Sequence, residues 1–237
     1  MDSYGTLAYE DRWPTEGDYD FNDLVIDYNF NQVTNGENKV VQIVASLVLK
    51  ATGANFRNGF GIELPVSPDR IKNVSGTSIR DYYVRNNSNG TESGQSYASV
   101  VIFENAYSEL KYPGGYLTGI NTTSDANYLE PRTFNITIDL TEPTGLNIIG
   151  TPPYNPYMIV NMDRSREVHL IDKKPTDLAD GKFFGTEDDH SIKEAGRYYV
   201  TKNNLPYAID IAGGFDYPTE KNRITLAYEK FVEWGLS

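Results

Sequence analysis

Two strand patterns joined by a tight-turn signal constrain the fold of this chain more than any other feature. Over residues 24–30 apolar and polar residues alternate, which is typical of a strand with one buried face. Asn35-Gly36 follows, and Asn-Gly between two strand patterns is the strongest local signal for a hairpin. The return segment, residues 39–52, is apolar and β-branched on both faces, so it predicts a central strand covered on two sides.

Shorter strand patterns recur through the rest of the chain, separated by residues typical of turns. They span residues 60–64, 79–84, 97–103, 134–140, 157–160, 167–171, 198–200 and 207–211. Many short strands punctuated by Gly, Asn and Pro predict an all-β fold, a β-sandwich or jelly roll with long loops. All-β domains commonly reach this size whole, so we expect residues 1–237 to form one domain.

The end of the chain has the pattern of an α-helix. Apolar residues recur there at helical spacing, with a mixed polar face opposite: Ile224, Ala227, Tyr228, Phe231 and Trp234. We predict one helix, over about residues 222–235, that packs on the sandwich. The alternative, a helix lying on a membrane surface, would have a polar face rich in Lys and Arg.

Carboxylates are concentrated in residues 10–24, directly before the first predicted strand. Six of them accompany a single cation, Arg12: Glu10, Asp11, Glu16, Asp18, Asp20 and Asp23. Carboxylates crowded in this way repel one another unless a cation neutralises them or they spread into solvent. The segment therefore predicts a metal site, and the alternative is a solvated acidic loop.

Oxygen ligands at every second residue are how a short loop gathers several oxygens around calcium. We predict a Ca²⁺ site whose ligands come from six side chains: Glu10, Asp11, Asp18, Asp20, Asn22 and Asp23. An extended backbone would place Asp18, Asp20 and Asn22 on one side, and a bend at Trp13-Pro14 would bring in the preceding arm. Calcium is favoured over zinc because the chain has no Cys and its two histidines lie far away in sequence.

The calcium loop of an EF-hand offers only a partial match. Asp18-x-Asp20-x-Asn22 fits its first three ligand positions, but Asp23 stands where that loop needs Gly, and Asn29 where it needs Glu. The flanking segments are also strand patterns, so the EF-hand fold is excluded.

A second acidic region covers residues 172–189, where lysines are interspersed among the carboxylates. We favour a salt-bridged loop there over a second metal site. His169 lies within an apolar strand pattern and His190 follows two aspartates, and we expect both to be structural.

Composition and motifs exclude several functions. A net charge of −12 and a pI near 4.6 argue against binding to nucleic acid or to anionic membranes. The longest apolar run, residues 40–49, is too short to span a bilayer, so we expect no membrane insertion by this chain. No Gly-x-Ser-x-Gly, phosphate-binding glycine loop or His-Glu-x-x-His is present, and we predict that the chain is not an enzyme.

Several motifs together resemble one known family. Leu7-Ala-Tyr-Glu-Asp11 and Gly17-Asp-Tyr-Asp-Phe-Asn-Asp-Leu-Val25 look like the signature of the LruC-type domain of bacterial surface proteins. Residues 154–161, 175–180 and 199–209 also fit, so the resemblance covers nearly the whole chain. It implies an exported protein at the extracellular or outer-membrane surface, a lipoprotein or anchored module whose signal is removed here. It implies no particular reaction.

We therefore predict a cell-surface module, adhesin-like or structural, with calcium in its acidic loop and a protein or glycan as partner. The alternative is a carbohydrate-binding module or carbohydrate-active enzyme on the same β-sandwich, because aromatic-rich sandwiches bind sugars by stacking. An exposed row of Tyr or Trp beside a groove would favour that alternative.

Overall fold

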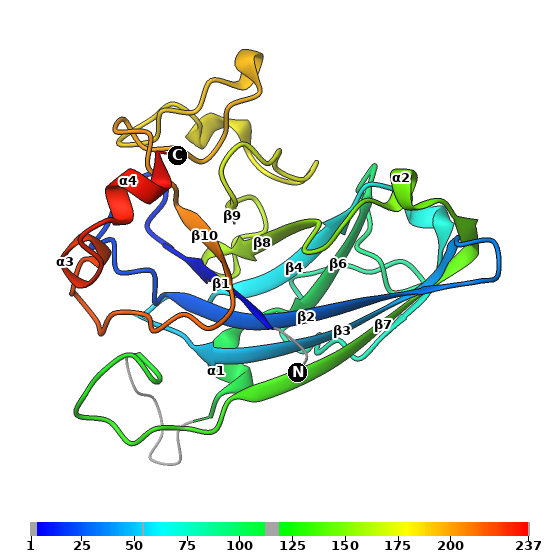
Figure 1. Cartoon of the computed structure of the whole chain (residues 1–237), viewed down its shortest axis with the longest axis horizontal. Helices are drawn as coiled ribbons and strands as arrows, with labels where there is room; N and C mark the ends of the chain where they lie inside the picture. Colours follow the sequence, from blue (N-terminus) through cyan, green and yellow to red (C-terminus); the bar gives the residue numbers. More distant parts are fainter. Residues whose placement is uncertain (1–3, 54, 112–118, 237) are drawn as a thin grey trace.

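The chain folds into two antiparallel sheets that pack face to face, as a computed structural model shows for residues 4–53, 55–111 and 119–236 (Figure 1). The six-stranded sheet has the order β10-β1-β2-β3-β7-β5, and the four-stranded sheet has the order β6-β4-β8-β9. The strands are β1 (Gly5–Tyr9), β2 (Leu24–Thr34), β3 (Val40–Ala51), β4 (Gly59–Leu64), β5 (Ile71–Ser75), β6 (Ala98–Phe103), β7 (Arg132–Thr144), β8 (Asn155–Ile159), β9 (Glu167–His169) and β10 (Ala208–Ala212). The predicted all-β, sandwich-like fold is confirmed.

Helical segments are short and lie between or after the strands. They are α1 (Ala106–Glu109), α2 (Leu146–Ile149), α3 (Ile224–Ala227) and α4 (Phe231–Gly235), with 3₁₀ turns η1 (Pro68–Arg70), η2 (Val160–Met162), η3 (Gly181–Phe183) and η4 (Lys193–Ala195). No helix in the described part of the chain is long and apolar enough to cross a bilayer.

Alternate residues of the strands build the core between the sheets. In β3 every second side chain from Ile43 to Leu49 is buried, which follows from the period of two along a strand. Aromatic rings meet across the interface, with centroids 5.2 Å apart for Phe103 and Phe134. β3 lies between β2 and β7, so the prediction of a central strand is correct.

The hairpin between β2 and β3 forms where Asn35-Gly36 predicts it. The Asn35 carboxamide oxygen accepts hydrogen bonds from the backbone N–H groups of Glu37 (3.0 Å) and Lys39 (3.1 Å). An Asn side chain that bonds to its own turn in this way stabilises the reversal of the chain.

Two predicted strands are not strands. Residues 79–84 form a loop, because the buried carboxylate of Glu104 accepts hydrogen bonds from the backbone N–H groups of Arg80, Asp81, Tyr82 and Val84. Residues 198–200 make only isolated bridges, since Tyr199 has a φ of 53°, which interrupts an extended backbone. Conversely, β1 and β5 have no counterpart among the predicted strands.

The predicted C-terminal helix is divided into α3 and α4. The break is at Tyr228, which is extended (φ −128°, ψ 91°) and packs back on the preceding loop. Its ring lies 5.7 Å from that of Phe215, and its hydroxyl donates to the carbonyl of Asp216 (2.8 Å). Tyr228 makes these contacts in place of the hydrogen bonds that would continue the helix.

Residues 10–23, called the acidic loop below, connect the neighbouring strands β1 and β2. Residues 213–236, called the C-terminal segment, follow β10 and cover the outer face of the six-stranded sheet beside β1 and β10 (Figure 1). A second apolar cluster fills the space between them, built from the sheet, the acidic loop and the C-terminal segment: Ala8, Tyr19, Phe21, Val25, Ala51, Leu205, Ile209, Phe215, Ile224 and Phe231. The acidic loop therefore packs against the C-terminal segment.

Candidate metal centre

The acidic loop is tightly turned and not extended. Tyr19 and Phe21 have φ of 59° and 54°, in the left-handed region that non-glycine residues seldom adopt. Both rings are buried, with centroids 4.8 Å apart. The loop thus buries both aromatic rings in the protein, whereas the side chain of Asp20, between them in sequence, has a different direction.

Glu10 holds this turned backbone in place. Its carboxylate oxygens accept hydrogen bonds from the N–H groups of Phe21 (2.5 Å) and Tyr19 (3.2 Å). Backbone N–H groups that point to one place, as they do where left-handed residues turn the chain, form a binding site for an anion. Burial raises the pKa of Glu10 well above its usual value, although the Phe21 N–H opposes this. Glu10 therefore shapes the loop and does not join the group of carboxylates described next.

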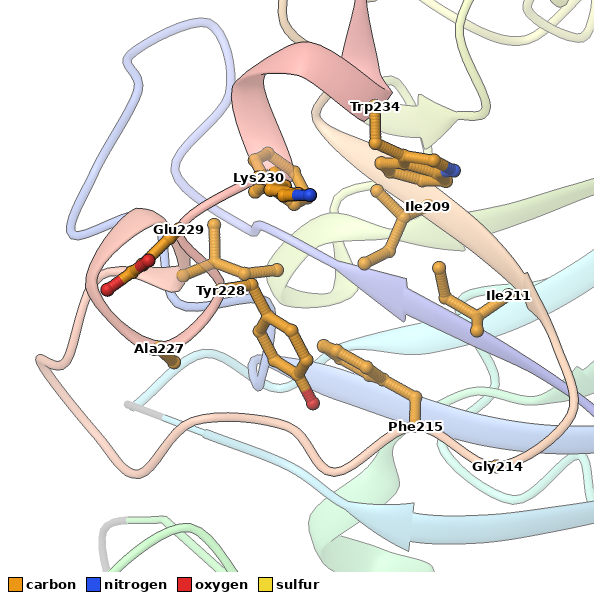
Figure 2. Close-up of a pocket in the computed structure, with 11 residues that line it drawn as sticks. Ile209, Ile211, Gly214, Phe215, Ala227, Tyr228, Glu229, Lys230 and Trp234 are labelled. Carbon is orange, nitrogen blue, oxygen red and sulfur yellow. The ribbon is translucent and has the colours of Figure 1, made fainter.

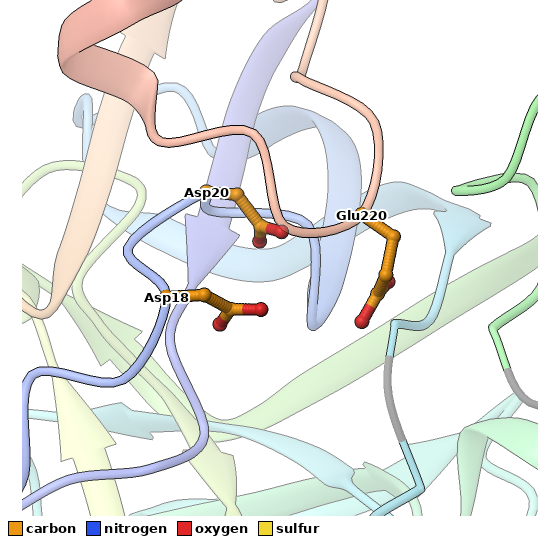
Figure 3. A group of neighbouring side chains, drawn as sticks. All are labelled: Asp18, Asp20 and Glu220. Carbon is orange, nitrogen blue, oxygen red and sulfur yellow. The ribbon is translucent and has the colours of Figure 1, made fainter.

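Three carboxylates converge at the junction of the acidic loop and the C-terminal segment (Figure 3). Asp18, Asp20 and Glu220 each offer an oxygen, and these atoms lie within 4.8 Å of one another. Asp20 is buried, whereas Asp18 and Glu220 are half-buried. Glu220 is 200 residues distant from Asp20, and no local signal in the sequence links the two.

Backbone contacts fix Asp20 in this group. Its oxygens accept hydrogen bonds from the N–H of Lys221 (2.8 Å) and the N–H of Asn22 (3.3 Å). Asp18 has no hydrogen-bond or ion-pair partner among the described residues. Since each carboxylate oxygen has two lone pairs, both side chains retain the capacity to bind a cation.

Asp11 and Asp23 line the same cavity as Asp18 and Glu220, which has a volume of about 550 Å³. Asp23 accepts a hydrogen bond from the backbone N–H of Asp11 (2.8 Å), and Asp11 Oδ2 accepts one from Asn58 (2.8 Å). Asp11 is 1% exposed, and its Oδ1 has no hydrogen-bond partner in the described part of the chain. Burial raises the pKa of Asp11, whereas the interaction of its carboxyl with that of Asp23 lowers it, and two buried carboxyls held this close need a proton or a cation between them.

Asn22 has a different position from the one predicted. Its amide nitrogen donates to the carbonyl of Pro218 (3.1 Å), which ties the acidic loop to the C-terminal segment. It does not line the cavity; its oxygen lies against Gly53, where an added Cβ would be 2.3 Å away. Gly53 thus allows the loop to approach β3, and Asn22 serves as a link between segments.

Burial and mutual repulsion oppose ionisation of the cavity carboxylates. Burial raises the pKa of Asp11 to about 6, and burial with the charge of Asp18 raises that of Asp20 to about 7. Burial and the neighbouring Asp11 raise the pKa of Asp23 well above its usual value. A divalent cation among these groups would reverse the effect, because it favours their charged forms.

Two cationic side chains, Arg12 and Lys221, also line the cavity. The Arg12 guanidinium lies 5.9 Å from the ring centroid of Phe56. Within the described ranges, neither cation forms an ion pair with Asp11, Asp18 or Asp23. The negative charge of these three aspartates is therefore not neutralised by direct pairing with either cation.

The family of the chain follows from a sequence comparison. Residues 38–237 match the model of a family described as a domain of unknown function, DUF4842. The chain belongs to this family. The matched region of the DUF4842 chain includes Glu220 and the whole C-terminal segment but begins after the acidic loop. No curated protein matches the sequence.

A solved structure has the same fold as this DUF4842 chain. It is the crystal structure of a "putative lipoprotein" from Bacteroides ovatus, with a TM-score of 0.68 and 14% sequence identity. The similarity covers 98% of this chain and 70% of the other. At this identity the comparison supports the fold, including the two-sheet arrangement.

The second acidic region of the DUF4842 chain uses its carboxylates as local caps. Asp189 accepts hydrogen bonds from the indole N–H of Trp13 (3.0 Å) and from Gly185 (2.7 Å), and Asp180 pairs with Lys182 (2.7 Å). Among the described residues, the acidic group at Asp18, Asp20 and Glu220 is the one with metal-binding spacing. In residues 172–189 the Asp180–Lys182 ion pair fits the predicted salt-bridged loop, whereas Asp189 accepts hydrogen bonds from N–H groups instead.

An apolar groove of about 550 Å³ lies between β10 and the C-terminal segment (Figure 2). Its walls are mainly hydrocarbon: Ile209, Ile211, Phe215, Tyr228, Phe231 and Trp234. Trp234 and Tyr228 are 44% and 39% exposed, so aromatic side chains do border a groove. The Tyr228 hydroxyl, however, already donates to the protein backbone.

Proposed function

We propose that this DUF4842 chain is an exported bacterial surface module that binds one calcium ion between its acidic loop and its C-terminal segment. Asp18, Asp20 and Glu220 are the proposed carboxylate ligands, with Asp11 and Asp23 lining the same cavity. One observation carries this proposal: carboxylates of the acidic loop and of the C-terminal segment meet beside a cavity lined by the buried Asp11, whose Oδ1 accepts no hydrogen bond from the described residues.

The donor set suits calcium by its chemistry. Calcium binds about six to eight oxygens in flexible geometry, and a cavity open to water can supply those that the protein does not. The donors here are carboxylates without His or Cys, a combination that disfavours zinc. The proposed ligands lie on an irregular loop and on the separate C-terminal segment. This arrangement favours calcium over magnesium, because magnesium requires near-ideal octahedral geometry.

Two similarities support a location at the cell surface. The motifs resemble the LruC-type domain of exported proteins, and the similar fold from Bacteroides ovatus carries the description of a lipoprotein. We propose a structural or adhesin-like binding role there, with a protein or glycan as partner, and no catalytic role. The sugar-binding alternative rests on the groove beside Trp234, which is mainly apolar, with Glu229 and Lys230 as its charged lining residues.

Calcium titration by calorimetry tests the proposal. The wild-type chain should bind one calcium ion at pH 7.5, with a dissociation constant of about 0.1–1 mM as in other extracellular modules. Asp20→Asn should weaken binding at least about tenfold, because the amide keeps the hydrogen bond from Lys221 but loses the charge. Asp69→Asn removes an exposed carboxylate outside the centre and should leave binding unchanged. Absence of saturable binding at several millimolar calcium would refute the proposal.

Calcium affinity should fall as the pH decreases from 7.5 to 5.5. Without metal, the pKa values of Asp20 and Asp11 are about 7 and about 6, so calcium must displace protons from both groups at the lower pH. We expect a loss of at least about tenfold, with proton release detectable as a buffer-dependent heat. These raised values also mean that the metal-free chain loses stability as the pH rises from about 4 towards 7. An affinity independent of pH would contradict this picture.

A further inference from the structure

The acidic loop provides much of the attachment of the C-terminal segment. Three hydrogen bonds that involve backbone groups connect them: from Lys221 N–H to the Asp20 carboxylate (2.8 Å), from the Asn22 amide to the Pro218 carbonyl (3.1 Å), and from Ile224 N–H to the Tyr19 carbonyl (2.8 Å). All three lie within residues 19–22 on one side and 218–224 on the other.

Aromatic packing continues this attachment beyond the hydrogen bonds. The Phe231 ring of α4 lies 5.5 Å from the ring of Phe21 and 6.0 Å from that of Tyr19. Arg223 forms an ion pair with Glu16 and places its guanidinium 5.7 Å from the Tyr19 ring. The conformation of the acidic loop therefore determines the surface on which α3 and α4 rest.

The same junction contains the principal charge conflict. Glu220 immediately precedes Lys221, whose N–H bonds to Asp20, and its carboxylate is grouped with those of Asp18 and Asp20. Ionised, these groups repel one another across the boundary between the two segments. A cation bound to all three carboxylates would remove this repulsion and connect the two segments.

We propose that calcium occupancy controls the docking of the C-terminal segment on the sheet; this rests on the function proposed above. With the ion bound, the acidic loop and Glu220 share ligands, and α3 and α4 stay against Tyr19 and Phe21. Without it, the segment opens more often from residue 218 onward. This opening also breaks the hydrogen bond from Glu220 N–H to the Thr122 carbonyl (2.8 Å).

The apolar groove depends on this docking. One wall comes from β10 through Ile209 and Ile211, whereas the other comes from the C-terminal segment through Tyr228, Phe231 and Trp234 (Figure 2). Release of the segment removes the second wall. The groove is therefore complete only while the C-terminal segment is docked.

Hydrogen exchange measured by mass spectrometry tests this inference on the full chain. Saturating calcium should slow exchange in peptides from residues 218–236 at least about tenfold, at exchange times at which peptides from the core strand β6 have not yet exchanged. Glu220→Gln should abolish this response at the same calcium concentration. Because Glu220→Gln also removes one repelling charge, its metal-free C-terminal segment should exchange more slowly than that of the metal-free wild type. Glu229→Gln, an exposed change in the same segment, should behave as wild type.

Calorimetry on the same samples separates the two proposals. If calcium binds but exchange in residues 218–236 does not change, docking control is refuted and the metal site stands. If calcium does not bind, both proposals are refuted. If residues 218–236 of the metal-free chain exchange no faster than β6, the segment opens only when the whole chain unfolds, and the specific control of docking is refuted.

Discussion

Saturating calcium should raise the midpoint of thermal unfolding, and Asp20→Asn should remove most of the increase. A ligand present at about a hundred times its dissociation constant stabilises the folded state by about 2.7 kcal/mol, or about 5–11 °C for a domain of this size. The gain is expected because the ion neutralises carboxylates that burial and mutual repulsion hold at raised pKa values.

A chelator should reverse this increase, and magnesium at the same concentration should produce a smaller one. Asp69→Asn is the matched control, because it removes an exposed carboxylate at a distance from the centre and should keep the full response. Equal melting curves for the wild-type chain with calcium and with chelator would contradict the proposed centre.

The second large effect concerns the four-stranded sheet and is independent of metal. Arg164 forms ion pairs with Glu92 and Glu167, whose side chains are 1% and 0% exposed. Arg164→Ala would leave two buried carboxylates without their counter-ion, and such a loss costs about 3–5 kcal/mol of unfolding free energy. Urea unfolding at pH 7 measures it.

The loss should shrink as the pH falls. Burial alone would raise the pKa of Glu167, but the His169 hydrogen bond and the charge of Arg164 lower it to about 2 in the wild-type chain. The wild type therefore loses this contribution progressively as the pH falls from about 4.5 to about 2, whereas the variant relieves its penalty by protonation at higher pH. Arg70→Ala, which removes an ion pair with the exposed Glu142, should cost no more than about 1 kcal/mol. Equal effects of the two substitutions would contradict a buried network.

The sequence predicts the fold well where local patterns determine the structure. The alternation in residues 24–30 and the turn at Asn35-Gly36 suffice for the hairpin, because register and turn chemistry are local. Residues 79–84 have a strand-like composition, but Glu104, a distant buried carboxylate, takes up their N–H groups. The helix predicted near Tyr228 is likewise interrupted there, because Tyr228 packs on Phe215.

Only some residues of the candidate centre can be predicted from the sequence. The crowding of Asp18 and Asp20 predicts a metal site, and the structure groups these two carboxylates. Glu220 was not predicted, because contact between segments 200 residues apart leaves no spacing pattern. Glu10 was predicted as a ligand, yet its oxygens bind the backbone of the loop, since Tyr19 and Phe21 adopt left-handed angles.

The central claim is that the acidic loop and the C-terminal segment bind one divalent ion together. Calcium titration of the wild-type chain at pH 7.5 is its most direct test. The account predicts a single saturable site that Glu220→Gln weakens as strongly as Asp20→Asn does. Saturable binding that depends on Asp20 but is indifferent to Glu220, or no binding at all, would contradict it.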